Sequence, residues 1–162
     1  VAAVVDGEPV AGASAMPATN DIYTAGPESV SRNDEPMTVS DRDDLAEFAI
    51  GTTGRWSTSD PATPTAIVRE VSERFGDSRR FGCIQGLLAL VAAGGMDGAI
   101  MPDPPNAWDS LAGVHLVRRA GGRATTLSGD RFTDGDDNLI VSNDRRHDAV
   151  LDAARAALSE SA

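Results

Sequence analysis

The sequence predicts an α/β protein, an α+β layered sandwich in which helices cover a β-sheet. One observation is that short apolar segments alternate with longer segments of helical periodicity from residue 45 onward. Another is that residues 1–40 contain only short apolar segments separated by polar turns. We therefore predict two domains, a β-meander at residues 1–40 and an α/β domain at residues 41–162.

The first forty residues contain two pairs that favour tight turns. Asp6-Gly7 and Asn33-Asp34 both tolerate the positive φ angles that short hairpin turns require. The apolar segments beside these turns are the predicted strands of the meander. They lie at residues 1–5, 10–13, 22–24 and 37–39.

The α/β part is predicted from the spacing of its apolar residues. Helices are expected at residues 64–75, 83–93 and 108–120, and a final amphipathic helix contains Val150 and Leu158. Strands are expected at residues 45–50, 97–101, 124–127 and 139–142. Residues 51–54, all small, are expected to form a loop that ends the first of these strands.

The composition narrows the class of protein. The net charge is -11, which disfavours a general binder of nucleic acid or anionic membranes, and no apolar run approaches the roughly 20 residues of a membrane span. The chain contains Arg but no Lys, a pattern that predicts a protein from a salt-accumulating halophile, with an ordinary acidic protein as the alternative. The single cysteine, Cys83, excludes an internal disulfide and fits a cytoplasmic location.

Asp109 is the strongest candidate for a catalytic or metal-binding residue. It follows a Pro-rich loop and lies where a helix is predicted to begin, so the partial positive charge of the helix N-terminus favours a carboxylate there. One interpretation is that Asp109 caps the helix. The other is that it binds Mg²⁺, which prefers carboxylate oxygen, while nearby helix amides hold phosphate oxygens.

The stretch around Asp109 resembles a known family. Trp108-Asp109, then Ala112-Gly113, an apolar helix and Ala-Gly-Gly at 120–122 are similar to the carboxy-terminal signature of inositol monophosphatases. Residues 5–12, 79–98 and 139–148 resemble further segments of that family in the same order. The resemblance implies the carboxy-terminal half of the inositol monophosphatase/fructose-1,6-bisphosphatase-like fold, with residues 1–40 remaining from its amino-terminal domain.

The resemblance also implies roles for individual residues. Asp109 takes the place of a catalytic metal ligand that also touches substrate. Cys83 replaces a hydroxyl residue in the family's Gly-Ser/Thr-Ala element, Thr52 retains the hydroxyl of a Gly-Ser element, and Asp103 is a substitute for a Glu that binds substrate hydroxyls. The implied substrate-binding residues are Gly82, Cys83, Ile84, Thr52 and Asp103.

The function implied by the resemblance is Mg²⁺-dependent hydrolysis of inositol monophosphate or a related sugar phosphate. A small phosphorylated substrate and a homodimer are the implied partners. The family's other metal-binding motifs, Gly-Glu and Asp-Pro-x-Asp-Gly-Thr, do not occur, and the chain begins with Val, so we expect an incomplete sequence that is inactive alone. Alternatives are a fructose-1,6-bisphosphatase, a 3'(2'),5'-bisphosphate nucleotidase and a non-catalytic anion-binding or interaction module.

Overall fold

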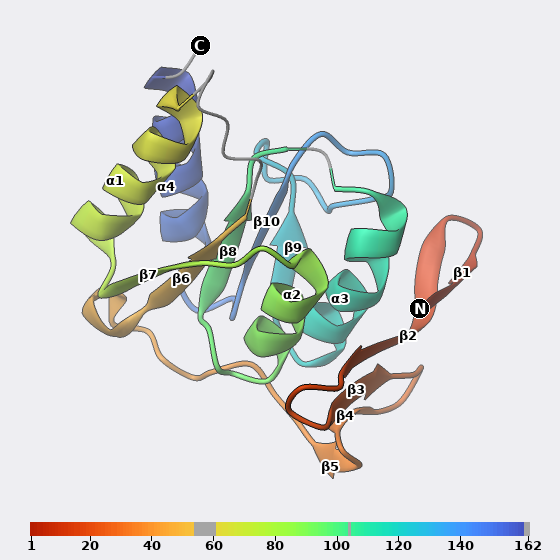
Figure 1. Ribbon diagram of the computed structural model, residues 1–162. Helices are drawn as coiled ribbons and strands as arrows, with labels where there is room; N and C mark the ends of the chain where they lie inside the picture. Colours follow the sequence, from red (N-terminus) through yellow and green to blue (C-terminus); the bar gives the residue numbers. More distant parts are fainter. Residues whose placement is uncertain (54–60, 104, 161–162) are drawn as a thin grey trace.

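The amino-terminal segment forms an antiparallel β-meander, seen at the lower right of Figure 1. This computed structural model describes residues 1–53, 61–103 and 105–160. Asp6 and Gly7 have φ angles of 51° and 82°, and Asn33 and Asp34 have 50° and 66°, so both predicted turns are confirmed. The five strands follow one another in chain order: β1 (Ala2–Val5), β2 (Glu8–Met16), β3 (Asp21–Ala25), β4 (Val30–Arg32) and β5 (Glu35–Pro36).

The strand predicted at residues 37–39 is wrong. The turn at Asn33 and Asp34 instead joins β4 to β5, two short strands whose polar composition carries no strand signal. After β5 the chain leaves the meander. The Val39 N–H then donates to the carbonyl oxygen of Ala120, the residue that follows the helix at residues 107–119. Met37 and Val39 are therefore apolar because they pack against the hydrophobic core, and not because they form a strand. Met37 is buried in that core.

The second sheet has the strand order β7-β6-β8-β10-β9. Strand β6 is parallel to both β7 and β8, and β10 is antiparallel to both β8 and β9. Its central strands are buried on both faces, as expected where helices cover both sides. The strands are β6 (Ala49–Thr52), β7 (Asp77–Arg80), β8 (Gly98–Met101), β9 (Arg123–Thr125) and β10 (Leu139–Ser142).

Two predictions near the start of this sheet are corrected. Residues 45–47 form a short 3₁₀ helix, η1 (Leu45–Glu47), because the Asp44 side chain caps it at the Ala46 N–H. Gly51 and Thr52 belong to β6 and not to a loop; Gly51 is small because a Cβ there would lie 2.2 Å from Leu87 Cδ1. The predicted loop residue 54 lies outside the described residues.

The helices divide between the two faces of this sheet (Figure 1). One face is covered by α1 (Ala62–Arg74) and α4 (His147–Glu160), and the other by α2 (Ile84–Ala92) and α3 (Ala107–Arg119). The four predicted helices are therefore confirmed, as are the three later strands, with their ends shifted by a few residues.

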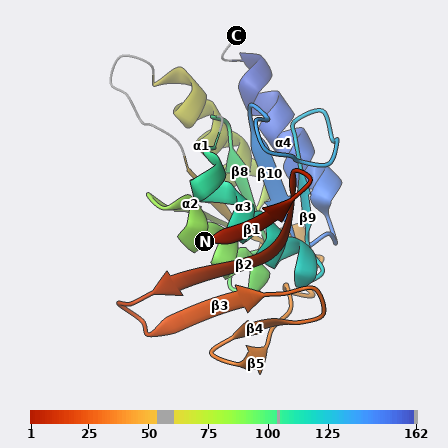
Figure 2. The same cartoon turned by 90° about the vertical axis from the view of Figure 1, so that its right-hand side faces the viewer.

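The meander packs on the outer side of α2 and α3, which completes a layered arrangement (Figure 2). Tyr23 and Ala25 of β3 belong to the same core cluster as Leu88 of α2 and Val114 of α3. A Cβ on Gly12 would lie 3.0 Å from the Ala112 carbonyl oxygen, so the β2 backbone lies directly on α3. The α/β fold class is thus confirmed, and the division of the chain after residue 40 stays a prediction.

Candidate functional site

The candidate residues gather at one edge of the second sheet. Because β6 and β8 are parallel, their carboxyl ends lie at the same edge, where Thr52 pairs with Ile100. The Phe81 N–H donates to the Thr52 carbonyl oxygen at 2.9 Å, which brings the start of α2 to this edge. The connection from β8 to α3, which contains Asp103, begins there as well. Thr52, Gly82, Cys83, Ile84, Asp103 and Asp109 are therefore placed around one rim.

Asp109 lies in the first turn of α3 and is partly buried. The N-cap of this helix is Asn106, so the interpretation of Asp109 as the cap is wrong. Instead, the Asn106 side-chain amide donates to Asp109 Oδ2 at 3.3 Å, and the Asp109 N–H donates to the Asn106 carbonyl oxygen at 2.9 Å. The carboxylate is thereby oriented at the positive end of the helix dipole.

Cys83 is the N-cap of α2. Its Sγ accepts a hydrogen bond from the Gly86 N–H at 3.4 Å, the role that a Ser or Thr hydroxyl usually has at a helix start. Gly82 and Cys83 are exposed, and Ile84 is half-buried. What this segment offers a ligand is the backbone of the first helical turn, whose N–H groups lack carbonyl partners within the helix.

Thr52 has a buried hydroxyl group with an unusual environment. Thr52 is only 3% exposed, and its Oγ1 atom has no hydrogen-bond partner among the described residues. Buried polar atoms are nearly always paired, so an unpaired one calls for an explanation. Among the described residues, the Nε2 atom of His115 is also buried without a partner, so the unpaired hydroxyl does not by itself assign a ligand to Thr52, whose substrate-binding role stays a prediction.

Two residues that contribute to this edge were missed from the sequence. Gln85 joins three elements, because its Oε1 accepts from Ser14 Oγ at 3.0 Å and its Nε2 donates to the Trp108 carbonyl at 3.2 Å. No sequence signal points to Gln85, since its partners are remote in the chain. Asn106 could have been found, because a spacing of three residues places it beside Asp109 in a helix's first turn.

The described residues do not by themselves form a complete Mg²⁺ site. Asp109 offers the oxygen ligand that Mg²⁺ prefers, but nowhere in residues 1–53, 61–103 and 105–160 do three or more His, Cys, Asp or Glu side chains converge as a metal-binding group. A complete coordination shell therefore does not fit this part of the chain, and Asp109 fits as one ligand of it.

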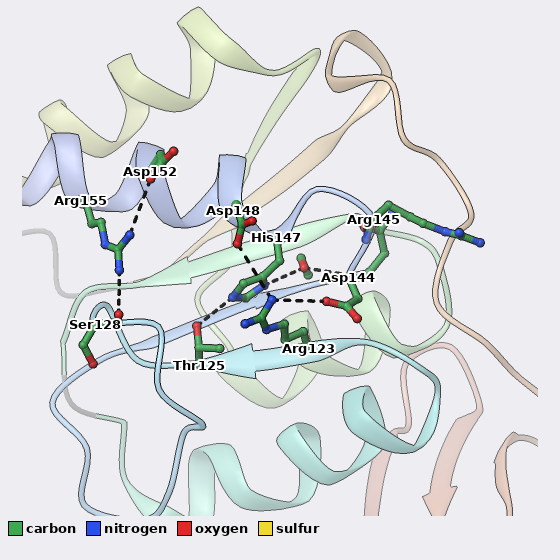
Figure 3. Close-up of polar contacts among 11 residues, drawn as sticks. Arg123, Thr125, Ser128, Asp144, Arg145, His147, Asp148, Asp152 and Arg155 are labelled. Carbon is green, nitrogen blue, oxygen red and sulfur yellow. Dashed lines mark hydrogen bonds and ion pairs between the residues drawn. The ribbon is translucent and has the colours of Figure 1, made fainter.

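A second polar cluster lies at the opposite edge of the sheet (Figure 3). There His147, at the start of α4, is 2% exposed, and its ring nitrogens lie 2.8 Å from Thr125 Oγ1 and 2.8 Å from Ser142 Oγ. Burial, assisted by the nearby charge of Arg123, lowers the pKa of His147 to about 4. Both ring nitrogens are occupied within the fold, so this cluster joins β9, β10 and α4.

Comparison with known proteins identifies the family. A model of the inositol monophosphatase family matches residues 1–160. This chain belongs to the inositol monophosphatase family. The resemblance found in the sequence is therefore confirmed.

Relatives of this inositol monophosphatase family member are longer than the chain. The inositol-1-monophosphatase of Caulobacter vibrioides is 32% identical over 91% of the chain and 59% of its own length. The fructose-1,6-bisphosphatase/inositol-1-monophosphatase of Aquifex aeolicus is 30% identical over 91% of the chain and 55% of its own length. The chain thus spans less than two thirds of these relatives.

Solved structures show the same fold. The Thermotoga maritima IMPase superposes with a TM-score of 0.91 at 27% identity, covering 99% of the chain and 61% of that protein. The extragenic suppressor protein suhB from Bartonella henselae superposes with a TM-score of 0.88 at 30% identity, covering 95% of the chain and 59% of that protein. These likenesses confirm the predicted fold; the roles of the individual site residues stay predictions.

Proposed function

We propose that this chain is the part of a Mg²⁺-dependent phosphomonoesterase that carries Asp109 and one wall of the substrate pocket. The substrate class is inositol monophosphate or a related sugar phosphate. The observation that carries the proposal is the placement of Asp109 at a sheet edge shared by the amino-terminal ends of α2 and α3. The names of the relatives, inositol-1-monophosphatases, support the same substrate class.

Each residue of the rim has a separate task in this proposal. Asp109 is one oxygen ligand of Mg²⁺, held in orientation by Asn106. The first-turn N–H groups of α2, beginning at Ile84, donate to phosphate oxygens. Bound Mg²⁺ would neutralise phosphoryl charge and lower the pKa of a water molecule. The remaining metal ligands come from sequence outside these 162 residues, in keeping with the incomplete set described above.

Two further points belong to the proposal. We also propose a cytoplasmic location, which the single cysteine supports, and a halophilic source, which the acidic, Lys-free composition supports. None of the described helices is both long and apolar enough to cross a membrane.

A second candidate substrate is fructose 1,6-bisphosphate, since the relatives from Aquifex aeolicus and Thermotoga maritima carry both activities in their names.

The proposal is tested by joining this chain, in the relative's order, to the part of the Caulobacter vibrioides enzyme outside the matched region. Phosphate release from inositol 1-phosphate, fructose 1,6-bisphosphate and adenosine 3',5'-bisphosphate is measured with and without Mg²⁺. We expect the chimera to hydrolyse inositol 1-phosphate and the 162-residue chain to release almost none. A folded but inactive chimera, beside an active intact relative, would contradict the phosphatase assignment. Strong hydrolysis by the chain alone would contradict the assignment of ligands outside it.

Asp109→Asn in the chimera tests the metal role. Asn can still accept from the Asn106 amide, so the melting temperature should stay nearly constant. Turnover and Mg²⁺ affinity should fall by at least the roughly 10- to 100-fold seen when only an outer-shell partner is lost. Asn106→Ala is the matched control, because it removes the orienting contact but keeps the carboxylate, and it should cost less. Activity within a few-fold of the parent would exclude Asp109 as a ligand.

A further inference from the structure

A pocket beside strand β9 is lined by three arginine side chains. The arginines are Arg118, Arg123 and Arg131, and among the described residues no Asp or Glu lines the pocket. All lining residues come from the segment 118–131, in the interior of the chain. The chain has 25 acidic and 14 basic residues, so a pocket whose charged lining is entirely cationic is opposite to its overall charge.

Arg118 is nearly buried in this pocket and has no close counterion. Its side chain is 13% exposed, and its Nη2 atom donates to the carbonyl oxygens of Ala124 at 3.4 Å and Phe132 at 2.5 Å. Among the described residues, the one carboxylate within 4.0 Å of Arg118 is that of Glu8. Its Oε2 atom lies 3.9 Å from Nη1, which is too far for a hydrogen bond. The fold therefore holds a positive charge in place without neutralising it.

The electrostatic environment of Arg118 favours a negatively charged ligand. Burial, assisted by the charge of Arg131, lowers the pKa of Arg118 to about 10. The guanidinium therefore remains charged at neutral pH, but the fold stabilises this charge less well than water does. An anion in the pocket would offset both the burial and the repulsion from Arg131.

Arg123 and Arg131 retain hydrogen-bond donors for such a ligand. Figure 3 shows Arg123 beside Asp144 and Asp148, but its Nη1 atom lies 3.9 and 4.0 Å from their carboxylate oxygens, beyond hydrogen-bond distance. Arg131 donates from Nη2 to Glu8 Oε2 at 2.9 Å, which uses one of the several N–H groups of its guanidinium. Both side chains can therefore donate further hydrogen bonds into the pocket.

We propose that this pocket binds one phosphate group, either as free inorganic phosphate or as part of a small phosphorylated metabolite. Guanidinium groups bind phosphate oxygens through paired, charge-assisted hydrogen bonds, and the charge of phosphate suits a site with several arginines. The cavity volume of about 240 Å³ is below the roughly 300–1,000 Å³ of pockets that take drug-sized ligands, so the ligand is compact. The pocket shares no residue with the rim that contains Asp109, so this proposal does not rest on the proposed phosphatase activity.

The test is a titration of the ¹⁵N-labelled 162-residue chain with inorganic phosphate, followed by amide NMR spectra. Metal-free buffer and constant ionic strength keep metal binding and screening out of the comparison. We expect the amide signals of Gly122 and Gly129, which line the pocket, to shift and reach saturation. A second titration uses glycerol 3-phosphate. Tighter binding of this ester would identify the ligand as a small phosphorylated metabolite, and tighter binding of inorganic phosphate would identify it as the free ion.

Substitutions of the pocket arginines show whether they bind the phosphate. Arg123→Gln and Arg131→Gln should each weaken binding roughly 10-fold or more, because each removes charge-assisted hydrogen bonds. Arg119→Gln is the matched control, since it removes the same charge from a residue outside the pocket lining and should change binding far less. Glu8→Gln should strengthen binding, because it removes a carboxylate that competes with the ligand for Arg131.

Three results would overturn the proposal. One is equal weakening by Arg119→Gln, which would show a response to net charge alone. Another is the absence of saturable shifts at Gly122 and Gly129. The third is a set of shifts confined to Gly82 and Ile84, which would place phosphate at the rim and leave the proposed phosphatase function intact. The spectra also report whether each variant is folded, and if Arg131→Gln does not fold, Arg123→Gln still decides.

Discussion

Thr52 and His147 are both buried polar residues, but the fold satisfies only one of them. His147 has a hydroxyl partner at each ring nitrogen, whereas the Thr52 hydroxyl has none among the described residues. The side chain that lacks a partner lies at the edge with Asp109, and the satisfied one lies at the opposite edge. His147 therefore contributes hydrogen bonds that hold the fold together, whereas the buried Thr52 hydroxyl contributes none.

Replacing the Thr52 hydroxyl tests this distinction. Thr52→Val keeps the shape of the side chain and removes the unpaired polar atom, so the isolated chain should gain about 1 kcal/mol of unfolding free energy. Urea denaturation measures the gain. Thr52→Ser, which keeps the hydroxyl and loses a methyl group, serves as the control and should be less stable than the parent. A loss of stability in Thr52→Val would mean that the hydroxyl has a partner in the fold.

His147 makes stability depend on pH. In the folded chain its pKa is lowered to about 4, while in the unfolded chain it is near 6.5. The unfolded state therefore binds the proton first, and the stability contributed by neutral His147 is present above pH 6.5 and lost as the pH falls toward 4. Linkage gives a loss of about 2 kcal/mol between pH 7 and pH 5.

The variant His147→Gln isolates this effect. Gln can bond to the hydroxyls of Thr125 and Ser142 but does not titrate, so the loss of stability between pH 7 and pH 5 should shrink by about 2 kcal/mol. Urea denaturation at the two pH values is the measurement. His115→Gln is the comparison, since burial also lowers the pKa of His115. A pH dependence unchanged in His147→Gln would show that other groups cause it.

At the level of elements, α2 and α3 are joined by their close approach at Gly113. A Cβ on this residue would lie 2.5 Å from Leu88 Cβ, an atom fixed to the α2 backbone. The glycine of the Ala112-Gly113 motif thus serves the spacing between two helices whose first turns form the candidate rim. The motif contains a glycine at this position without showing why a side chain is excluded there. The packing shows that Leu88 is the neighbour that leaves no room for a Cβ.

Gly113→Ala should destabilise the chain although Ala is the better helix former. The gain of roughly 1 kcal/mol in helix propensity is outweighed by overpacking against Leu88, which typically costs about 1–3 kcal/mol. Gly86→Ala in α2 is the matched control, because there a Cβ would meet the flexible end of Met16 at 3.4 Å and the Cys83 side chain at 3.6 Å, which are ordinary contact distances. Thermal melts should show Gly86→Ala at or above the parent and Gly113→Ala below it. The opposite order would contradict the packing argument.

At the scale of the whole molecule, the fold pairs a buried carboxylate and leaves most acidic side chains at the surface. Asp97 is fully buried, yet its carboxylate accepts from Arg42 Nη1 at 2.9 Å, from the Ala49 N–H at 2.8 Å and from Ser40 Oγ. This contact attaches the connector after the meander to the second sheet. The excess negative charge therefore lies mainly on the surface, where dissolved salt can screen it.

The stability of the chain should rise with salt. At molar KCl the Debye length falls to about 3 Å, so repulsion among surface carboxylates is largely removed while the Asp97 contacts, which are shielded by burial, persist. Melting temperatures in low and molar KCl are the measurement, and sucrose of equal osmolality is the control for general effects of cosolutes on burial. A melting temperature that stays constant or falls with KCl would contradict the halophile interpretation.

The sequence alone determined the features that depend on neighbours in the chain. Helical spacing and the Asp6-Gly7 turn indicated the fold class and four helices, and the Trp108-Asp109 motif together with further matching segments in the same order indicated the family. Local periodicity reports these features because each depends on residues a few positions apart. The sequence also placed Asp109 correctly at the start of a helix, although the helix cap, one of the two interpretations of this residue, is Asn106 instead.

Only the tertiary structure decided the features that depend on remote contacts. The apolar residues 37–39 look like a strand until Val39 is seen bonded to Ala120, and Gly51 looks like a loop until Leu87 is seen against it. In the same way, Gln85 has significance only through Ser14 and Trp108. Burial and hydrogen bonding between distant segments set these outcomes, and residue types a few positions apart carry no record of which distant segment will lie beside them.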